Sequence, residues 1–182
     1  MRKKILILSA SPRKGGNSET LCNQFTKGAQ ESGHEVVKIR LHEKKIGFCT
    51  GCAACLKLGH CVQKDDMEEI LEKMTKADVI VLATPVYYYN MNAQMKVMID
   101  RTLAGQEKIQ NKEFYLIATA ADGKVDMDLT FEGLRGYLRC LPNAHQPNAK
   151  EMGVVYGADA FELGDIKNNP AMQKAYEFGL KA

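Results

Sequence analysis

Four cysteines lie close together in the sequence, on a segment that could hold a redox-active metal group. They follow the spacing C-x2-C-x2-C-x5-C, at Cys49, Cys52, Cys55 and Cys61. Four thiolates at this spacing can ligate a [4Fe-4S] cluster, because C-x2-C-x2-C with a nearby fourth cysteine is close to ferredoxin-type spacing. Structural zinc more often uses two separated C-x2-C pairs, so zinc is a second alternative. Reduced thiols or a disulfide are the third, and the spacing leaves all three open.

Residues 9–20, SASPRKGGNSET, are rich in groups that hydrogen-bond a phosphate. Gly15 and Gly16 let backbone amides turn toward an anion, and Arg13 adds a fixed positive charge. A helix after such a loop points the positive end of its dipole at the ligand. Side chains that can donate hydrogen bonds are those of Ser11, Asn17, Ser18 and Thr20. The alternative is a simple turn with a helix cap, but a bare turn would not need Arg13 among so many donors.

Other phosphate-binding signatures are absent from the sequence. It contains neither the G-x-x-x-x-G-K-[ST] motif of nucleoside triphosphatases nor the G-x-G-x-x-G motif of dinucleotide-binding folds. No cysteine precedes an arginine by six residues, which disfavours a small tyrosine phosphatase. A phosphate monoester is therefore the expected ligand of residues 9–20.

Three consecutive tyrosines follow the most apolar segment of the chain. They are Tyr87, Tyr88 and Tyr89, within the run TPVYYYN at 84–90. Three neighbouring side chains cannot all point inward on a regular element. At the end of a strand they can form a wall for a flat aromatic ligand, through ring stacking and backbone amides. Packing of at least one tyrosine against a partner subunit is the alternative, and it is compatible with the first reading.

The elements that must position these groups alternate between strands and helices. Short apolar runs predict strands covered on both faces, at 3–9, 34–41, 78–84, 112–121 and 151–156. Apolar residues at helical spacing predict helices within 21–33, 65–74, 92–103 and 134–141, and after 170. We expect Pro85 to stop the third strand and Asn92 to cap the helix that follows it. Asp65 and Glu68 are expected to form a capping box.

This alternation predicts an α/β fold, a three-layer sandwich in which helices cover both faces of a five-stranded parallel sheet. Five strands are too few for an eight-stranded barrel, so the doubly wound strand order 2-1-3-4-5 is expected. Residues 1–182 then form a single domain, with a cysteine-rich loop at 42–64. Ligands of such sheets bind at the carboxyl ends of the strands, at the switch point. The loops after Ser9 and Thr84 should therefore lie side by side.

Composition narrows the class of protein. The 182 residues are 45% hydrophobic and 26% charged, with a net charge of +3 that is too small to indicate a nucleic-acid surface. No apolar run approaches the ~20 residues of a membrane-spanning helix, and the apolar run near the N-terminus is too short for a secretion signal. Clustered cysteines in such a chain indicate metal or redox chemistry. We expect a cytoplasmic protein without nucleic-acid or membrane partners.

The segments SPRKGGNSETL and DVIVLATPVYYYNMNAQMKVMIDR resemble the NAD(P)H-dependent FMN reductase group of flavodoxin-like proteins, especially the branch that contains the iron-sulfur flavoproteins. The likeness covers Lys3 to about Arg101. It implies that FMN is the cofactor. The positions that would hold its phosphate are Ser9, Ser11, Arg13, Asn17, Ser18 and Thr20. The positions that would lie against its ring are Pro85, Val86, Tyr87, Tyr88, Tyr89 and Asn90.

The resemblance also implies an activity. NADH or NADPH would deliver hydride to flavin N5, and the electrons would pass to a small acceptor such as a quinone, a nitro or azo compound, a metal ion or a flavin. No side chain need act as an acid or base. The cysteine segment is similar to that of iron-sulfur flavoproteins, so an electron carrier with ferredoxin-like partners is the alternative. A homodimer or homotetramer is expected, because a partner subunit commonly completes such flavin sites in this family.

Two further segments carry expectations of their own. Residues 119–123 should close the other side of the ring, although they depart from the Gly-rich loop of the family. Lys96, Asp100 and Arg101 can form an i,i+4 ion pair, and we expect them to be structural.

Overall fold

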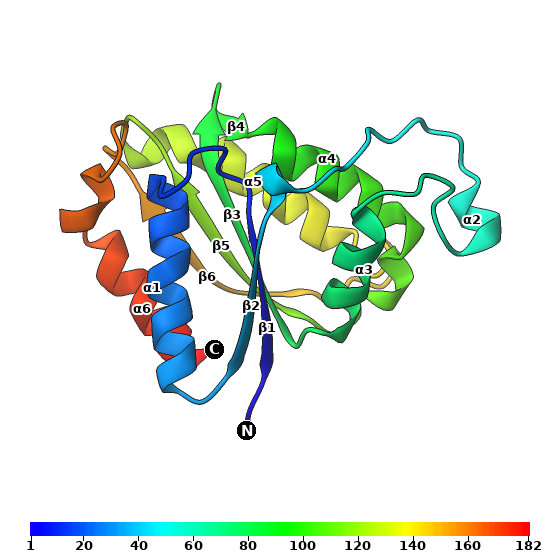
Figure 1. Cartoon of the computed structure of the whole chain (residues 1–182), viewed down its shortest axis with the longest axis horizontal. Coiled ribbons are helices and arrows are strands. Elements are labelled where there is room, and N and C mark those ends of the chain that lie inside the picture. Colours follow the sequence, from blue (N-terminus) through cyan, green and yellow to red (C-terminus); the bar gives the residue numbers. More distant parts are fainter.

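All 182 residues are described by the computed structural model, in which helices cover both faces of a central sheet (Figure 1). Five strands are parallel: β1 (Lys4–Ser9), β2 (Glu35–Arg40), β3 (Val79–Tyr87), β5 (Glu113–Thr119) and β6 (Lys150–Gly157). They pair in the order β2-β1-β3-β5-β6, and β4 (Asn90–Met91) adds an antiparallel pair to β3. Counted without β4, this is the predicted order 2-1-3-4-5, so the predicted fold class is confirmed.

The helices divide between the two faces. Helices α1 (Asn17–Glu31) and α6 (Ala171–Lys181) cover one face, and α3 (Met67–Lys76), α4 (Ala93–Arg101) and α5 (Asp128–Arg139) cover the other. Helix α2 (Cys55–Leu58) is a single turn inside the cysteine segment, which extends beyond the sheet near α3 and α4 (Figure 1). Short 3-10 turns are η1 (Leu41–Glu43), η2 (Thr102–Ala104), η3 (Gln106–Lys108), η4 (Lys124–Met127) and η5 (Asp165–Asn168). No helix is both long and apolar enough to cross a bilayer.

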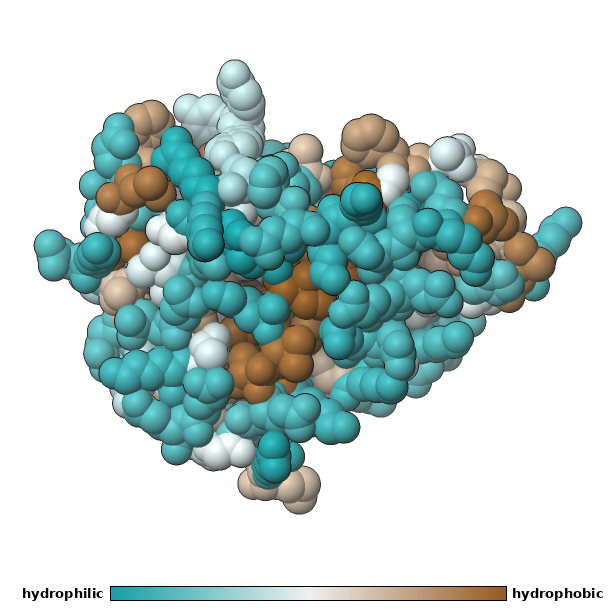
Figure 2. All heavy atoms as spheres, in the orientation of Figure 1, coloured by the Kyte–Doolittle hydropathy of each residue, from teal (hydrophilic) through white to brown (hydrophobic).

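Both faces of the sheet are buried, which explains the continuous apolar strands. Leu6 and Leu8 of β1 pack into the core under α3, α4 and α5. Ile5 and Ile7, which point to the opposite face, pack into the core under α1 and α6. At the sheet edge, β2 is less covered, and Figure 2 shows apolar side chains between hydrophilic ones over this part of the surface.

Two glycines bring α1 and α6 into backbone contact. A Cβ added at Gly28 would lie 2.2 Å from the carbonyl oxygen of Tyr176, and one at Gly179 would lie 2.1 Å from that of Phe25. Real Cβ atoms do not approach so closely, so only glycine permits this helix crossing. The crossing fixes the position of α1. This helix begins within residues 9–20, the segment predicted to bind a phosphate, which we call the phosphate-type loop.

Strand β3 continues to Tyr87, so the prediction that Pro85 ends it is wrong. Ala83 accepts a hydrogen bond from the Ala10 amide on the β1 side, whereas β1 has ended before Pro85 is reached. The missing N–H of Pro85 faces that same side, because residues two apart on a strand face alike. On the other side Pro85 stays in register with Thr119 of β5.

The two predicted helix caps have different outcomes. Asn92 caps α4 as expected, since its Oδ1 accepts a hydrogen bond from the Met95 amide at 3.2 Å. The capping box of Asp65 and Glu68 is not formed, and α3 begins at Met67. Asp65 Oδ1 instead accepts a hydrogen bond from the Met67 amide at 3.1 Å, and the same carboxylate is bonded to Arg101.

Candidate functional site

The carboxyl ends of the parallel strands meet in one cleft. Its lining combines the loop after β1, the end of β3 and the segments after β5 and β6, which contribute Ser11, Arg13, Asn17, Ser18, Pro85, Val86, Tyr87, Thr119, Ala121, Ala160 and Phe161. The predicted meeting of the loops after β1 and β3 is therefore observed. Ser9, Thr20, Tyr88, Tyr89 and Asn90, which the sequence also proposed for this site, do not line it.

The loop after β1 folds tightly onto itself. The Gly16 amide donates to the Arg13 carbonyl at 3.1 Å, and the Ser11 hydroxyl donates to the same carbonyl at 3.3 Å. Gly15 has a φ of +69°, and a Cβ added at Gly16 would lie 2.7 Å from Ser11 Oγ. Both glycines are therefore required by the path of the loop. Their own amides do not face an anion as expected, because that of Gly16 donates to the Arg13 carbonyl and that of Gly15 to Glu19.

Glu19 holds this loop in place. Nothing in the sequence indicated this role for an acidic residue. Its Oε2 accepts a hydrogen bond from the Gly15 amide at 2.8 Å, and its Oε1 lies 3.2 Å from both Lys38 Nζ and Arg40 Nε of β2. Burial alone would raise the pKa of Glu19, but the Gly15 amide, Lys38 and Arg40 hold it below its ordinary value. Glu19 is therefore an ionised, buried support of the loop.

The polar side chains of the loop differ in which of their hydrogen-bonding atoms remain free to bind a ligand. Ser9 Oγ is buried without a hydrogen-bond partner. Ser18 Oγ is 3.1 Å from Thr119 Oγ1, and Thr20 Oγ1 donates to the Gly16 carbonyl at 3.1 Å. Asn17 uses its whole side-chain amide on the segment after β6, with bonds to residues 160, 162 and 164. The backbone amides of the first turn of α1 are the donors left over.

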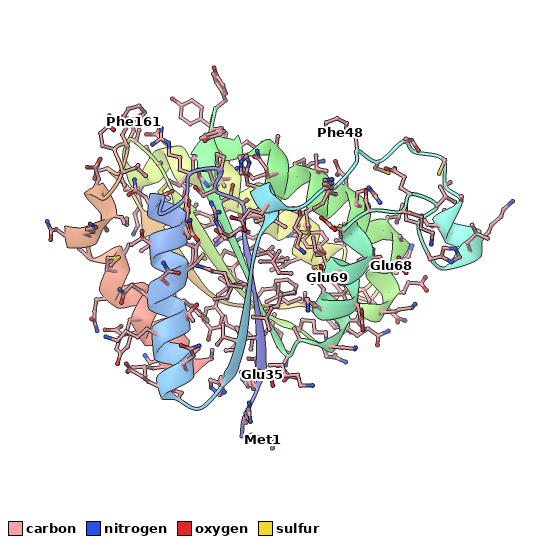
Figure 3. The ribbon with its side chains drawn as sticks, in the orientation of Figure 1. Met1, Glu35, Phe48, Glu68, Glu69 and Phe161 are labelled. Atoms are coloured by element: carbon pink, nitrogen blue, oxygen red, sulfur yellow. The ribbon has the colours of Figure 1, made fainter.

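Arg13 and Phe161 form one side of the cleft, and Figure 3 labels Phe161 at the edge of the molecule. The Arg13 guanidinium donates to the Phe161 carbonyl at 2.8 Å and lies 5.7 Å from the centre of its ring. Sequence reasoning missed Phe161, because the segment after β6 has neither a motif nor a periodic pattern. An aromatic ring beside the phosphate-type loop adds an apolar surface to a polar site.

The three tyrosines are divided by a tight turn. Tyr87 pairs with Asn90 across the β3–β4 hairpin, so Tyr88 and Tyr89 are its two central residues. Their φ values are +51° and +61°, as a two-residue type I′ turn requires, although bulky residues rarely adopt this conformation. Tyr88 is fully exposed and Tyr89 is 57% exposed. Of the three proposed wall residues, only Tyr87 lines the cleft.

The residues of the cleft fit FMN. The free amides at the start of α1 and the cation of Arg13 suit a phosphate monoester, whereas the Ser9 hydroxyl is buried away from the cleft. The end of β3, at Pro85, Val86 and Tyr87, offers a partly exposed surface beside that loop for a flat ring. Because the donors and the apolar surface adjoin, one molecule that carries both a phosphate and an aromatic ring can use both.

The four clustered cysteines lie on one exposed segment and form no disulfide. Cys49 and Cys52 are exposed, while Cys55 and Cys61 are partly buried. The Ala54 amide and the Thr50 side chain lower the pKa of Cys52. Four thiols match an iron-sulfur cluster in kind and number, but no three metal-ligating side chains are gathered in this structure. The positions of the sulfurs therefore do not form a metal site as they stand.

Lys96, Asp100 and Arg101 do not act as one surface group. Lys96 Nζ and Asp100 Oδ1 form the expected i,i+4 pair at 2.6 Å. Arg101 points the other way, into the base of the cysteine segment, and its side chain is only 1% exposed. The spacing of residues along a helix cannot show which charged side chain is exposed and which is buried. The carboxylate that pairs with Arg101 comes from a distant segment of the chain.

A sequence profile of the NADPH-dependent FMN reductase family matches residues 3–153, and the chain belongs to this family. It is an oxidoreductase of the flavodoxin-like fold. An iron-sulfur flavoprotein of Archaeoglobus fulgidus is 35% identical over 98% of this chain and 78% of its own length. An iron-sulfur flavoprotein of Methanocaldococcus jannaschii is 33% identical over 98% of this chain and 94% of its own.

Solved structures share the fold at low sequence identity. An FMN-dependent NADH-azoreductase from Bacillus anthracis, in complex with FMN, superimposes with a TM-score of 0.72 at 14% identity, over 100% of this chain and 99% of its own. An NAD(P)H:quinone oxidoreductase from Methanothermobacter marburgensis has a TM-score of 0.71 at 16% identity, over 100% and 96%. These two likenesses establish the architecture only.

Proposed function

We propose that the chain binds FMN in the cleft at the carboxyl ends of its strands and passes electrons from NADH or NADPH through it to a small acceptor. The observation that carries this proposal is the meeting of a phosphate-type loop with the end of β3 in one cleft. Membership of the NADPH-dependent FMN reductase family supports it. FMN, once bound, supplies the hydride and electron chemistry.

The residues of the chain would bind and orient the cofactor rather than react with it. The amides of the first turn of α1, together with Ser11 and Arg13, would hold the phosphate by charge-assisted hydrogen bonds. Pro85, Val86 and Tyr87 would hold the ring against the end of β3. Glu19 would keep the loop in shape without touching the ligand, because it is bonded to Gly15 from the side of β2.

The acceptor would be a small molecule such as a quinone, a nitro or azo compound, a metal ion or a flavin. Tyr87 is 46% exposed and Phe161 is 60% exposed, so the cleft is open to solvent between them. An open flavin face admits a nicotinamide and then an acceptor in turn. Geometry and access, rather than acid–base groups, would provide catalysis.

A second candidate function is an electron carrier in which the cysteine segment holds a [4Fe-4S] cluster beside FMN. Two relatives covering 98% of the chain at 33% and 35% identity are named iron-sulfur flavoproteins, which favours this candidate. Cys49, Cys52, Cys55 and Cys61 would be the ligands. The cluster would supply one-electron chemistry to partners of the ferredoxin kind.

The proposal includes self-association in the cytoplasm. Apolar side chains are exposed around the carboxyl ends of the strands, among them Tyr88, Leu129 and Phe161. Exposed apolar patches at a binding site commonly mark a protein interface. A second copy of the chain, in a dimer or tetramer, would cover them, and free thiols suit a reducing compartment.

The absorbance spectrum of the purified protein, with iron and acid-labile sulfide assays, separates the two candidates. FMN absorbance with steady NADPH oxidation in the presence of a quinone supports the oxidoreductase. Stoichiometric iron and sulfide, with a visible shoulder that dithionite bleaches, supports the carrier. A colourless protein that takes up no FMN contradicts both.

A further inference from the structure

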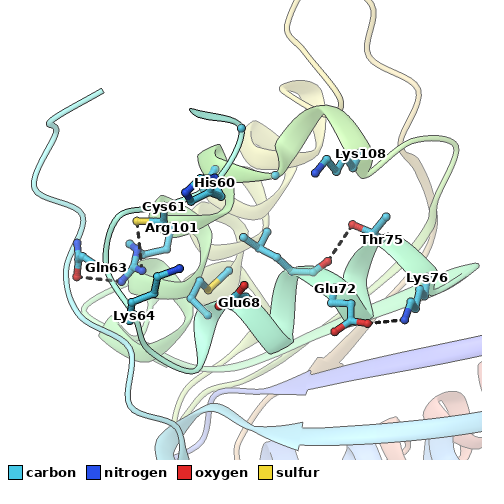
Figure 4. A pocket seen from close by; sticks show the side chains of 15 residues that line it. His60, Cys61, Gln63, Lys64, Glu68, Glu72, Thr75, Lys76, Arg101 and Lys108 are labelled. Atoms are coloured by element: carbon cyan, nitrogen blue, oxygen red, sulfur yellow. Dashed lines mark hydrogen bonds and ion pairs between the residues drawn. The ribbon is translucent and has the colours of Figure 1, made fainter. Parts of the chain in front are cut away.

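Arg101, at the end of α4, contacts the cysteine segment through most of its guanidinium. Its Nη1 donates to the Gly47 carbonyl at 2.6 Å, to Asp65 Oδ2 at 2.7 Å and to Gln63 Oε1 at 3.2 Å. Its Nη2 donates to Asp65 Oδ1 at 3.1 Å and lies 3.5 Å from Cys61 Sγ. Figure 4 shows Cys61 and Gln63 joined to Arg101 at one end of a hollow between this segment and α3.

These partners come from both ends of the segment that carries the cysteines. Gly47 precedes Cys49, the first of the four, whereas Gln63 and Asp65 follow Cys61, the last. The two ends are also joined directly, because the Gly47 amide donates to Asp65 Oδ2 at 2.9 Å and the Gln63 side chain donates to the Phe48 carbonyl at 2.9 Å. Arg101 is thus at the centre of a clasp that closes residues 48–61 into a loop.

The energetics favour a fixed rather than a mobile contact. Burial disfavours the charged guanidinium, but the bonds to Asp65 outweigh this effect and raise the pKa of Arg101 above its ordinary value. A buried cation without its carboxylate would be strongly destabilising, since the charge would remain desolvated. Two parallel N–H···O bonds also fix the direction of the guanidinium, which a single bond would not.

Helix α4 connects this clasp to the flavin cleft. It begins at Asn92, whose Nδ2 donates to the Ala10 carbonyl at 2.7 Å, in the loop that leads to the phosphate site. The Asn92 amide also donates to Thr84 Oγ1 at 3.1 Å, at the end of β3. One nine-residue helix therefore has its first end at the cleft and its last residue at Cys61.

We propose that Arg101 is the positioning residue of the cysteine site. It closes the base of the loop and holds the Cys61 sulfur by an N–H···S contact, at a place fixed relative to the flavin cleft by α4. Its role toward a bound cluster rests on the second candidate function, whereas its role in closing the loop does not. Hydrogen bonds to cluster sulfurs are among the factors that set reduction potential, so Arg101 would also tune a cluster bound through Cys61.

The test compares Arg101→Lys, Arg101→Met and Asp65→Asn with Lys96→Met. Lys96 is on the same helix in an exposed ion pair, so its variant controls for loss of a cation from α4. Three quantities are measured on the proteins as purified: hydrogen exchange of residues 48–62, the rate of iron loss to a chelator, and the midpoint potential of the cluster. FMN content and the melting temperature report on the rest of the fold.

For Arg101→Lys and Asp65→Asn we expect at least tenfold faster exchange in residues 48–62 and several-fold faster iron loss, with FMN content unchanged. Arg101→Lys should also lower the midpoint potential, and Lys96→Met should match the wild type in all three. If Arg101→Met does not fold, the other two variants decide. Wild-type exchange in both of them overturns the clasp. Faster exchange with wild-type iron loss and potential overturns the role at Cys61. An iron-free wild type refutes the cluster, and exchange alone then decides on the clasp.

Discussion

The carboxylate of Glu19 accepts a hydrogen bond from the amide of Gly15 at 2.8 Å, so a buried acid holds the loop that would bind the phosphate of FMN. The arrangement separates the acid from the ligand, since the opposite oxygen is paired with Lys38 and Arg40 of β2. The negative charge is thereby neutralised within the protein, and the amides of the first turn of α1 stay available for an anion.

We predict that Glu19→Gln weakens FMN binding about tenfold, which corresponds to about 1.4 kcal/mol. The amide of glutamine is a weaker acceptor for the Gly15 N–H. It also leaves Lys38 without its counter-charge and Arg40 with Glu43 alone. Fluorescence titration of the apoprotein with FMN measures the effect. Lys96→Met, remote from the loop, is the control. Unchanged affinity would show that the loop keeps its shape without this acid.

The same residue predicts a pH dependence of stability. The folded-state pKa of Glu19 lies below its ordinary value of about 4.3. Its contribution is therefore fully present above about pH 4.3 and is lost as pH falls through the lower folded pKa. The difference in unfolding free energy between wild type and Glu19→Gln should shrink across this acid window and be constant from pH 6 to 8. Urea unfolding at several pH values tests this, and a gap that widens in acid would contradict it.

We predict that Gly16→Ala reduces FMN affinity by tenfold or more without unfolding the protein. The added methyl group would lie 2.7 Å from Ser11 Oγ and 3.0 Å from the Arg13 carbonyl oxygen, so the loop must open to admit it. Gly136→Ala is the matched control, because a Cβ there meets nothing within 4 Å and alanine favours the interior of α5. An FMN affinity equal to that of the control would show that the loop geometry is not needed for binding.

The hairpin tip offers a prediction in the stabilising direction. Tyr88 and Tyr89 have positive φ values, and such a conformation costs a non-glycine residue roughly 1–2 kcal/mol. Replacing them with Asn-Gly, the preferred pair for a type I′ turn, should raise the unfolding free energy by about 1 kcal/mol. Chemical denaturation of the double variant measures this. A fall in stability would mean that the two rings make contacts in the assembled protein that outweigh the backbone strain.

Helix crossing at Gly28 predicts a large loss of stability. Alanine there would place a methyl group 2.2 Å from the Tyr176 carbonyl oxygen, a backbone atom that cannot move alone. Overpacking of this kind typically costs about 1–3 kcal/mol. We expect the upper end, because the two nearest atoms, the Tyr176 carbonyl oxygen and the Leu180 nitrogen, both belong to the backbone. Thermal unfolding of Gly28→Ala against Gly136→Ala tests the prediction. Equal melting temperatures would show that α1 and α6 separate at little cost.

The sequence was sufficient for the sheet and for the place of the site. Continuous apolar runs predicted the parallel strands, because both faces of each strand are covered, and the strand order followed from right-handed crossovers. The loops after Ser9 and Thr84 were expected to adjoin, and both contribute to one cleft. Only local pattern and topology were needed for these inferences.

What the sequence could not predict depends on contacts between distant segments. Arg101 has the same spacing as a surface residue of α4, yet its carboxylate partner is Asp65, 36 residues earlier. Asp65 in turn bonds the Met67 amide at the start of α3 and Arg101 together, rather than forming a capping box with Glu68. Phe161 joins the cleft because Arg13, Asn17 and Asp165 fix the segment after β6. Contacts between such distant residues leave no periodic pattern in the local sequence.

The most direct test of the account is a calorimetric titration of the apoprotein with FMN and, separately, with riboflavin. The phosphate is the only difference between them, and charge-assisted hydrogen bonds to it contribute about 1.5–3 kcal/mol each. We predict one FMN per chain, bound at least 100-fold more tightly than riboflavin. Equal affinities for the two flavins, or no uptake of FMN, would contradict the assignment of residues 9–20 and the end of β3 as a flavin mononucleotide site.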